Sequence, residues 1–425
     1  MAEVQEGYPG VSKHKRQNSS LRILFAGVTY PTETFITRLI QGLADSGIEV
    51  TIASEKSPRD DSSQNDSQIQ WLRLPRWSSN PLSRLWWLSW LTGRAFLRAP
   101  RDAVLFARGA RQAQSFSERL RSWCLFAPFA GHRCDVIYFP WNSAAIVLWP
   151  LFELGCPVVI SCRGSQINVA PHDPTRSEFR QDLRKTLEQA TAVHCVSHAI
   201  KQEAEQYGLD ATKAWIIHPA VDTEFFSPAD KRRETNDVFR VITTGGLFWV
   251  KGYEYALTSI RQLIDMGIAV QYDIIGDGPE RQRLLYTIHD LDLRKHVQLH
   301  GRVGRERVRD LVCRADVFLL SSLSEGVSNA ALEAMACGLP VVTTDCGGMR
   351  ELVSDGIEGF VVPPRQPGAM TRELARLARN PKLRESLGRA ARRTTVERFN
   401  IGVQIARFGE LYRAASRNSP TSSHA

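Results

Sequence analysis

One stretch of the chain, residues 315–344, constrains the fold more than any other. It holds two short apolar runs, Val317–Leu320 and Val341–Thr344, of the kind that form buried parallel strands. Between them, Ala330–Ala336 is rich in good helix formers, and Gly338 is suited to end a helix before the second run. The order of these segments predicts a β–loop–α–β unit. The same alternation elsewhere in the chain predicts an α/β protein with parallel sheets.

Two acidic residues lie in this unit with seven residues between them. Glu325 precedes the predicted helix, and Glu333 lies about one turn inside it. The helix N-terminus, capped by Ser328 or Asn329, offers unpaired N–H groups and a partial positive charge, which suit a diphosphate. Because a carboxylate accepts hydrogen bonds from hydroxyl groups, the spacing suits a nucleotide-sugar, with Glu325 on the sugar and Glu333 on the ribose. Taken alone, two such residues are more often solvated acids, one in a loop and one on a helix surface, because charged side chains are mostly exposed.

The surroundings of the two acids carry a family resemblance. Residues 324–342 read Ser-Glu-Gly-Val-Ser-Asn-Ala-Ala-Leu-Glu-Ala-Met-Ala-Cys-Gly-Leu-Pro-Val-Val. This run resembles the Glu-x7-Glu motif of retaining glycosyltransferases with the GT-B fold, in the large family often numbered four. The resemblance implies two doubly wound Rossmann-like domains that face each other across a cleft. It also implies that the second domain binds the donor through Gly326, Val327, Ser328, Asn329 and Glu333.

At 425 residues the chain is long enough for two domains, each with its own core. The first domain opens with two apolar strands, Leu21–Ala26 and Ile48–Ala53, separated by a helical segment. Ligands bind beyond the carboxyl ends of such strands, so Gly27 is a candidate donor-site residue. The predicted organisation is a tail at 1–20, an acceptor-binding domain at 21–226 with an insertion at 76–133, a linker at 227–237, a nucleotide-sugar-binding domain at 238–395, a final helix at 396–417 that crosses back to the first domain, and a tail at 418–425.

A helix over Ser143–Leu154 is predicted between the strands Asp135–Phe139 and Pro157–Cys162, and the second strand leads into Arg-Gly-Ser-Gln. Many members of the family have His-Gly-x-Asp here, whereas this chain has Arg163 and Gln166. The loop is more similar to the Ser-x-Arg-Gly-Ser-Asp variant of polysaccharide-type members. We predict that Arg163 contacts the donor phosphate or an anionic acceptor. The alternative is a structural arginine that ties down the loop.

The loop after the first strand of the second domain reads Gly-Gly-Leu-Phe-Trp-Val-Lys-Gly over residues 245–252. It resembles the family's Gly-Arg-Leu-x-x-x-Lys-Gly, in which the two cations neutralise the departing diphosphate. Lys251 matches, and we expect it to act as a point charge for phosphate rather than as a surface lysine. Gly246 stands at the position of the arginine, so one cation is missing. Arg163 is the candidate to supply it from across the cleft.

Two further loops are predicted to line the donor. Gly276 belongs to a Gly-x-Gly turn, where the absence of a side chain lets the backbone approach the nucleotide. Arg302 and Val303 resemble the segment whose backbone meets the base. Asp290 and Asp292 have the spacing of a metal-binding pair, but they fall at a helix end away from the predicted cleft.

The segment from Arg76 to Arg133 contains ten arginines and no lysine, against Asp102 and Glu118 as its only acids. It also holds a tryptophan cluster at 86, 87 and 90. A basic, tryptophan-rich segment is typical of proteins that bind an anionic membrane surface or nucleic acid. No nucleic-acid-binding motif accompanies it, so we predict a membrane surface and no nucleic acid. The alternative is a packed helical pair with a solvated arginine face.

Together with these features, the resemblance implies an enzyme that transfers a sugar from a nucleoside-diphosphate sugar to a carbohydrate or lipid-linked hydroxyl, with retention, in polysaccharide or glycolipid synthesis. The resemblance implies neither a protein nucleophile nor a metal or other cofactor. A nucleotide-sugar epimerase and a non-catalytic sugar-nucleotide-binding protein remain alternatives. Eight scattered cysteines indicate free thiols in a reducing compartment, and no run approaches the length of a membrane span. We therefore expect the protein in the cytoplasm, peripherally at the inner face of the membrane.

Overall fold

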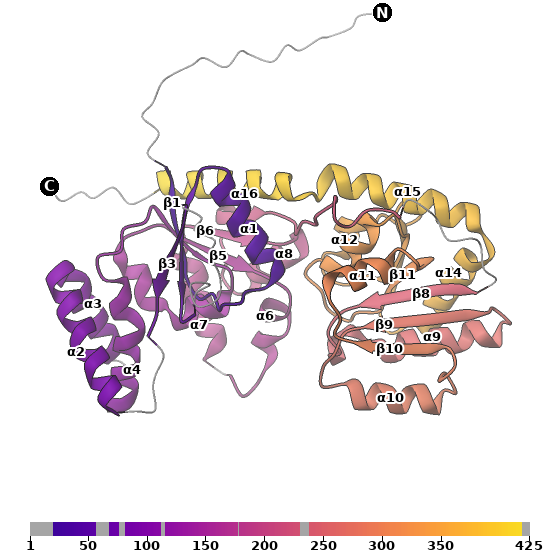
Figure 1. Cartoon of the computed structure of the whole chain (residues 1–425), viewed down its shortest axis with the longest axis horizontal. Helices are drawn as coiled ribbons and strands as arrows, with labels where there is room; N and C mark the ends of the chain where they lie inside the picture. Colours follow the sequence, from indigo (N-terminus) through magenta and orange to yellow (C-terminus); the bar gives the residue numbers. More distant parts are fainter. Residues whose placement is uncertain are drawn as a thin grey trace, which may run out of the picture.

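The chain folds around two parallel sheets that lie side by side along its long axis (Figure 1). The computed structural model describes residues 20–56, 68–75, 81–111, 115–176, 178–229 and 238–418. Residues 230–237 of the predicted linker, and the predicted tails apart from Ser20 and Asn418, lie outside the described residues.

The first sheet has the order β3-β2-β1-β4-β5-β6-β7, and all of its pairings are parallel. Its central strands are buried because helices cover both faces, which explains their near-continuous apolar sequences. The strands are β1 Arg22–Phe25, β2 Glu49–Ser54, β3 Ile69–Arg73, β4 Val136–Phe139, β5 Val158–Cys162, β6 Ala192–Cys195 and β7 Ala214–Ile216.

The helices around this sheet are mostly short. Helix α1 buries Ile36, Leu39, Ile40 and Leu43, the 3-and-4-residue spacing of a helix with one apolar face. The predicted helix 143–154 is wrong in its second half. There Pro150 cannot continue the α-helical hydrogen bonds, and a 3-10 segment forms over Trp149–Leu154. The helices are α1 Thr34–Asp45, α5 Asn142–Val147, α6 Ser165–Asn168, α7 Phe179–Gln189 and α8 His198–Gln206.

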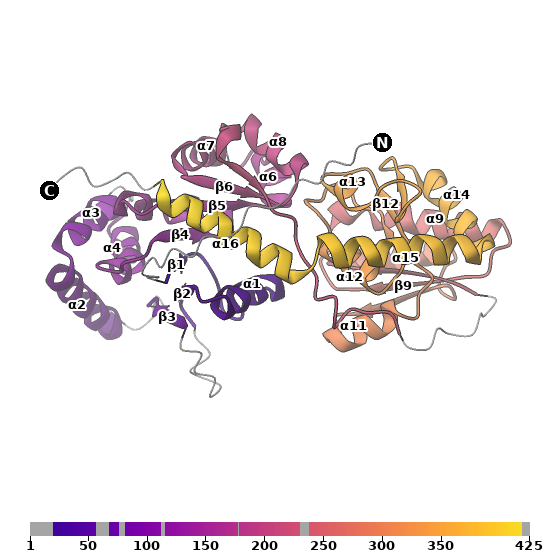
Figure 2. The same ribbon diagram turned by 90° about the horizontal axis from the view of Figure 1, so that it is seen from above.

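The basic insertion forms three helices at the end of the first domain that lies away from the second sheet (Figures 1 and 2). They are α2 Pro81–Arg98, α3 Pro100–Arg111 and α4 Phe116–Phe126, so the insertion is not the helical pair of the alternative. A capping box begins α4, with Ser115 and Glu118 bonded to each other's backbone. Among the described residues, no helix is both long and apolar enough to cross a membrane.

The second sheet has the order β10-β9-β8-β11-β12-β13, again with parallel pairings. The predicted β–loop–α–β unit is confirmed as β11, α12 and β12, and Ser328 is the cap of α12. The strands are β8 Phe239–Thr244, β9 Val270–Ile275, β10 Val297–Gly301, β11 Val317–Leu320, β12 Val341–Thr344 and β13 Gly359–Val362. The helices are α9 Tyr253–Asp265, α10 Arg281–Asp290, α11 Arg305–Val312, α12 Asn329–Ala336, α13 Met349–Leu352 and α14 Pro367–Arg379.

Two long helices join the halves of the molecule (Figure 2). Helix α15, Pro381–Arg398, packs on the second domain, and α16, Ile401–Arg417, begins after Asn400, whose side chain caps it. Helix α16 then crosses to the first domain, where Phe408, Leu411 and Tyr412 are fully buried against one face of the first sheet with residues of α1. The predicted crossing of the last helix is therefore confirmed.

Candidate active site

Each sheet has one point at which the strand order reverses, between β1 and β4 in the first and between β8 and β11 in the second. Ligands of doubly wound sheets bind outside the carboxyl ends of the strands at such points. The loops that follow β8 and β11 carry Lys251 and Glu325. The sheet topology therefore brings together the two residues predicted to act on the diphosphate and the sugar.

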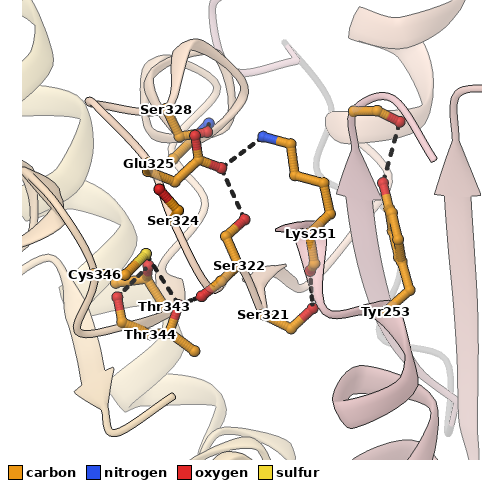
Figure 3. Close-up of polar contacts among 12 residues, drawn as sticks. Lys251, Tyr253, Ser321, Ser322, Ser324, Glu325, Ser328, Thr343, Thr344 and Cys346 are labelled. Carbon is orange, nitrogen blue, oxygen red and sulfur yellow. Dashed lines mark hydrogen bonds and ion pairs between the residues drawn. The ribbon is translucent and has the colours of Figure 1, made fainter. Parts of the chain in front are cut away.

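Lys251 and Glu325 form an ion pair, with 2.6 Å between the lysine Nζ and the glutamate Oε1 (Figure 3). The hydroxyl of Ser322 donates to the same Oε1 at 2.7 Å. The two charged side chains are only 24% and 11% exposed, so the pair is partly shielded from water. Gly252, in the left-handed region at φ 57°, lets this loop approach β11, because a Cβ there would lie 2.4 Å from the carbonyl oxygen of Ser321.

The N-terminus of α12 lies directly beside this pair. The Ser328 hydroxyl accepts a hydrogen bond from the Ala331 N–H, so that hydroxyl already acts as the helix cap. Val327 is buried, whereas Asn329 is exposed at the first position of the helix. The Gly326 carbonyl accepts from the Gly348 N–H at 2.7 Å, which fixes the loop against its neighbour after β12. The arrangement offers helix N–H groups and the Lys251 cation to one anionic group.

Glu333 lies one turn further along α12 in a different environment. Burial raises the pKa of its carboxyl from an ordinary value of 4.5 to about 7, although Arg38 and Arg305 lower it in part. Arg305 is held by two contacts. Its Nη2 lies 2.8 Å from the Oδ2 of Asp222, and its guanidinium carbon lies 3.6 Å from the centre of the Phe225 ring. Neither arginine was predicted, because one comes from α1 and the other from α11, and neither belongs to a motif.

The remaining loops of the second domain lie at the same edge of the sheet. The Gly276 N–H donates to the Gly301 carbonyl at 2.9 Å, and a Cβ on Gly276 would lie 1.8 Å from the carbonyl oxygen of Gly245. Only glycine therefore fits at this turn. Arg302 is exposed, and Val303 packs against the apolar cluster that includes α12.

Gly246 stands where the family has an arginine, and the side chain of Phe248 fills the space next to it. A Cβ at this position would lie 2.6 Å from the Cε2 atom of Phe248, so the aromatic ring covers the glycine. Phe248 is half exposed, so one side of its ring faces solvent. The backbone of Gly246 is not in the left-handed region, so a larger residue causes no backbone strain there.

We expect the variant Gly246→Arg to leave turnover unchanged or to raise it, because it adds a second cation for the leaving diphosphate. Initial rates at saturating donor measure this. The double variant Gly246→Arg/Phe248→Ala is the control, since it removes the ring that the new side chain must displace. A strong loss of turnover in both variants would show that the diphosphate does not pass Gly246.

The first-domain residues are placed as follows. Gly27 lies just after β1 with φ 75°, and a Cβ there would lie 2.3 Å from that of Ala144 in α5. The guanidinium of Arg163 lies 4.8 Å from the Phe35 ring and 6.0 Å from the Trp141 ring, and its Nη2 donates to the Tyr138 hydroxyl at 3.4 Å. These contacts all lie within the first domain. The role of Arg163 as a donor cation stays a prediction.

Gln166, the other departure from the family's loop, is bonded within the first domain. Its side-chain oxygen accepts hydrogen bonds from the N–H and the hydroxyl of Ser143.

The two domains meet next to the Lys251–Glu325 pair. Asn168 donates through Nδ2 to the Ser324 hydroxyl and to the Glu325 carbonyl, both at 3.2 Å. Further out, Glu351 of α13 accepts from the His198 N–H at the start of α8 and lies 2.8 Å from the Nε2 of His218. Loops of both domains therefore border this pair.

Comparison with known proteins decides the family. The model described as "Glycosyltransferase Family 4" matches residues 32–225, and the model described as "Glycosyl transferases group 1" matches residues 227–394. The chain belongs to the family 4, group 1 glycosyltransferases. The family predicted from the sequence is thus confirmed, and retention of configuration stays a prediction.

Individual relatives agree with this family. A component of the phosphatidylinositol N-acetylglucosaminyltransferase of Arabidopsis thaliana is 33% identical over 42% of this chain and 40% of its own length, so the chain matches about two fifths of that relative. The putative colanic acid biosynthesis glycosyltransferase WcaL of Escherichia coli is 26% identical over 81% of this chain and 87% of its own length.

Solved structures match the fold over nearly the whole chain. A glycosyltransferase from Rickettsia africae has a TM-score of 0.69 at 17% identity and covers 95% of this chain and 100% of its own. HepE of Anabaena in complex with UDP-glucose has a TM-score of 0.67 at 19% identity, covering 93% and 100%. The predicted α/β GT-B fold is confirmed.

Proposed function

We propose that this chain transfers a sugar from a nucleoside-diphosphate sugar to a hydroxyl acceptor, with retention of configuration. The observation that carries the proposal is the Lys251–Glu325 pair at the reversal point of the second sheet, beside the N-terminus of α12. A diphosphate that reaches Lys251 replaces Glu325 as the partner of the ammonium group. The carboxylate, still held by Ser322, is then free to accept hydrogen bonds from hydroxyls of the donor sugar.

In this mechanism the sugar C1–oxygen bond breaks and its electron pair stays on the phosphate. Lys251 and the N–H groups of α12 stabilise the charge that develops there, so catalysis is positioning plus electrostatic stabilisation and assigns no role to a metal. The acceptor hydroxyl attacks C1 from the same face, and its proton passes to the departing phosphate oxygen. Glu333 accepts from the ribose hydroxyls.

The names of relatives support a donor and an acceptor class. Structural neighbours from Anabaena were solved with UDP and with UDP-glucose, which supports a UDP-sugar donor. WcaL and the amylovoran glycosyltransferase of Erwinia amylovora are named for polysaccharide synthesis, and the Arabidopsis relative for transfer to phosphatidylinositol. We infer a carbohydrate or lipid-linked acceptor in polysaccharide or glycolipid synthesis at the cytoplasmic face of a membrane.

Incubation with a panel of radiolabelled UDP-, GDP- and ADP-sugars, with and without a bacterial lipid extract, tests the proposal. We expect release of the nucleoside diphosphate and transfer of label for one donor. Isomerisation of the sugar without release identifies an epimerase instead. Binding without either change, seen as a raised melting temperature, identifies a non-catalytic sugar-nucleotide-binding protein.

The helices α2, α3 and α4 support the proposed membrane surface. Trp86, Leu97 and Phe116 are 61%, 88% and 74% exposed, and Arg98 and Arg101 are exposed as well. The two acids of the segment are engaged within the protein, since Asp102 accepts from the Gly131 N–H and Glu118 forms the capping box of α4. The alternative of a packed helical segment with a solvated arginine face is right in part. Trp123 is buried and donates a hydrogen bond to Thr92, and Trp87 packs on the core.

We expect the protein to co-sediment with vesicles that contain anionic lipid and not with neutral vesicles, because each arginine near an anionic surface contributes about 1 kcal/mol. Binding should weaken as salt is raised, since the charges are screened. The triple variant Arg94→Gln/Arg98→Gln/Arg101→Gln should reduce sedimentation without altering nucleotide affinity. A matched control removes Arg372, Arg376 and Arg379 from α14 of the second domain. Absence of vesicle binding at every salt concentration contradicts the prediction.

A further inference from the structure

A buried chain of hydrogen bonds begins at Arg163 and crosses strands β4, β5 and β6 on the face of the first sheet that α16 covers. The Tyr138 hydroxyl lies 2.6 Å from the Ser161 Oγ, which lies 2.6 Å from the Nδ1 of His194. The Nε2 of His194 lies 2.8 Å from the Ile217 carbonyl oxygen, and the Nη2 of Arg163 reaches the Tyr138 hydroxyl at 3.4 Å. Tyr138, Ser161 and His194 are fully buried.

The chemistry of the two ends fixes the direction of every hydrogen bond. The Ile217 carbonyl can only accept, so the Nε2 of His194 carries the proton. Burial lowers the pKa of His194 well below 6.5, so the ring is neutral and its Nδ1 accepts from the Ser161 hydroxyl. The Ser161 oxygen then accepts from Tyr138, and the Tyr138 oxygen accepts from Arg163. The chain runs one way, from the guanidinium to the carbonyl, with no donor or acceptor in conflict.

The Arg163 end of the chain lies at the active site. Gly164 packs against Gly326, since a Cβ on Gly326 would lie 3.1 Å from the Gly164 nitrogen. The α6 turn that follows Gly164 includes Asn168, which donates to the Glu325 carbonyl. The position of the Arg163 backbone therefore determines the positions of Gly164 and Asn168, which both contact the loop that carries Glu325.

The other end lies at the crossing between the domains. His218, next to Ile217, lies 2.8 Å from Glu351 of the second domain, and its carbonyl accepts from Gln404 of α16. Phe408 of α16 packs edge-on against the His194 ring, with 4.7 Å between ring centres. The chain thus connects the segment that leaves the first domain with the loop that contacts Glu325.

We propose that Arg163 is a positioning residue, and that Tyr138, Ser161 and His194 hold its guanidinium so that the Gly164–Asn168 turn fixes Glu325 for catalysis. This rests on the proposed function and assigns Arg163 a role other than that of a donor cation. The Phe35 and Trp141 rings at its guanidinium agree with this role, because planar contacts of this kind hold an arginine in one orientation.

The test is a double-mutant cycle of Tyr138→Phe and Arg163→Ala, assayed with the UDP-sugar that the donor panel identifies. We expect Tyr138→Phe to lower kcat about tenfold with the donor KM within about twofold, because the positioning bond is lost and the donor site is intact. In the Arg163→Ala background, Tyr138→Phe should lower kcat no further. Tyr272→Phe is the matched control. Its buried hydroxyl lies 2.8 Å from Thr243 in the second sheet, and kcat should not change.

Arg163→Lys separates the two roles, because lysine keeps the charge and loses the planar contacts. Full activity of Arg163→Lys, or an undiminished effect of Tyr138→Phe without Arg163, overturns the proposal. Hydrogen exchange of the Ile167 and Asn168 amides gives a second measurement that needs no substrate. Tyr138→Phe should speed this exchange and Tyr272→Phe should not. If the wild-type protein turns over no donor, the proposed function is wrong. The positioning role is tested separately by hydrogen exchange, and it is wrong if the Ile167 and Asn168 amides exchange at the same rate in Tyr138→Phe and Tyr272→Phe.

Discussion

Replacing Lys251 by alanine is expected to lower turnover by about a hundredfold or more. The ammonium group is the cation that the proposed function assigns to the leaving diphosphate, and removing one preorganised electrostatic partner typically costs about 10²–10³ in kcat. The same change leaves the nearly buried Glu325 with Ser322 as its remaining side-chain partner. Breaking a buried pair costs about 3–5 kcal/mol. Because Ser322 remains, the loss of stability, measured by thermal melting, should fall at the lower end of that range.

Two further variants separate catalysis from stability. Lys251→Met/Glu325→Gln removes both charges, so we expect it to recover most of the stability and none of the turnover. Arg350→Ala breaks an exposed pair with Asp345, 2.7 Å between Nε and Oδ1, at the neighbouring loop. Such surface pairs contribute about 0–1 kcal/mol, so this variant should behave like the wild type. Full activity of Lys251→Ala would place the diphosphate elsewhere.

The parts of the fold that follow from local sequence were predicted well. Residues 315–344 contain their own strand, cap, helix and stop, and each of these depends on neighbours within a few positions. Helix α7 was not predicted, because only Leu183, Thr186 and Leu187 of its residues are buried and its apolar signal is weak. The 3-10 segment after α5 was missed although Pro150 signals it, because the apolar pattern continues through the proline.

The site was predicted one residue at a time and not as an arrangement. Lys251 and Glu325 are 74 positions apart, and only the strand order brings their side chains together. Asn168 touches the Glu325 carbonyl from 157 positions away, across the domain boundary, with no motif to indicate it. Arg163 stands out in the sequence through its place in a motif, but that place does not tell where the guanidinium points, and its role stays a prediction. The guanidinium donates to Tyr138, which is linked to Ser161 and His194, and these three read in the sequence as ordinary strand residues.

Glu333→Gln is expected to stabilise the free protein at pH 8 while weakening its affinity for UDP. Burial raises the pKa of Glu333 to about 7 in the folded state, from an ordinary value of 4.5. Between these pH values the folded state keeps a proton that the unfolded state has lost, so this carboxyl lowers stability as pH rises from 4.5 through 7. Above pH 7 the full cost is present, with an upper bound of about 3 kcal/mol. Glutamine does not titrate, so the variant does not carry this stability cost.

The expected loss of affinity has the same pH dependence as the gain in stability, because both effects require the ionised carboxylate of the wild-type protein. An ionised carboxylate on the ribose contributes about 1.5–3 kcal/mol, so Glu333→Gln should weaken UDP binding by about tenfold to a hundredfold at pH 8. Wild-type affinity should fall as pH drops below 7, where Glu333 takes up a proton, and the variant should lose this dependence. Melting curves and UDP titration calorimetry at pH 5.5 and pH 8 measure both effects, with the exposed Glu306→Gln as control. If wild-type UDP affinity is the same at both pH values, Glu333 does not bind the ribose. A variant less stable than the wild type at pH 8 would show instead that the carboxylate is held by Arg38 and Arg305 as a structural ion cluster.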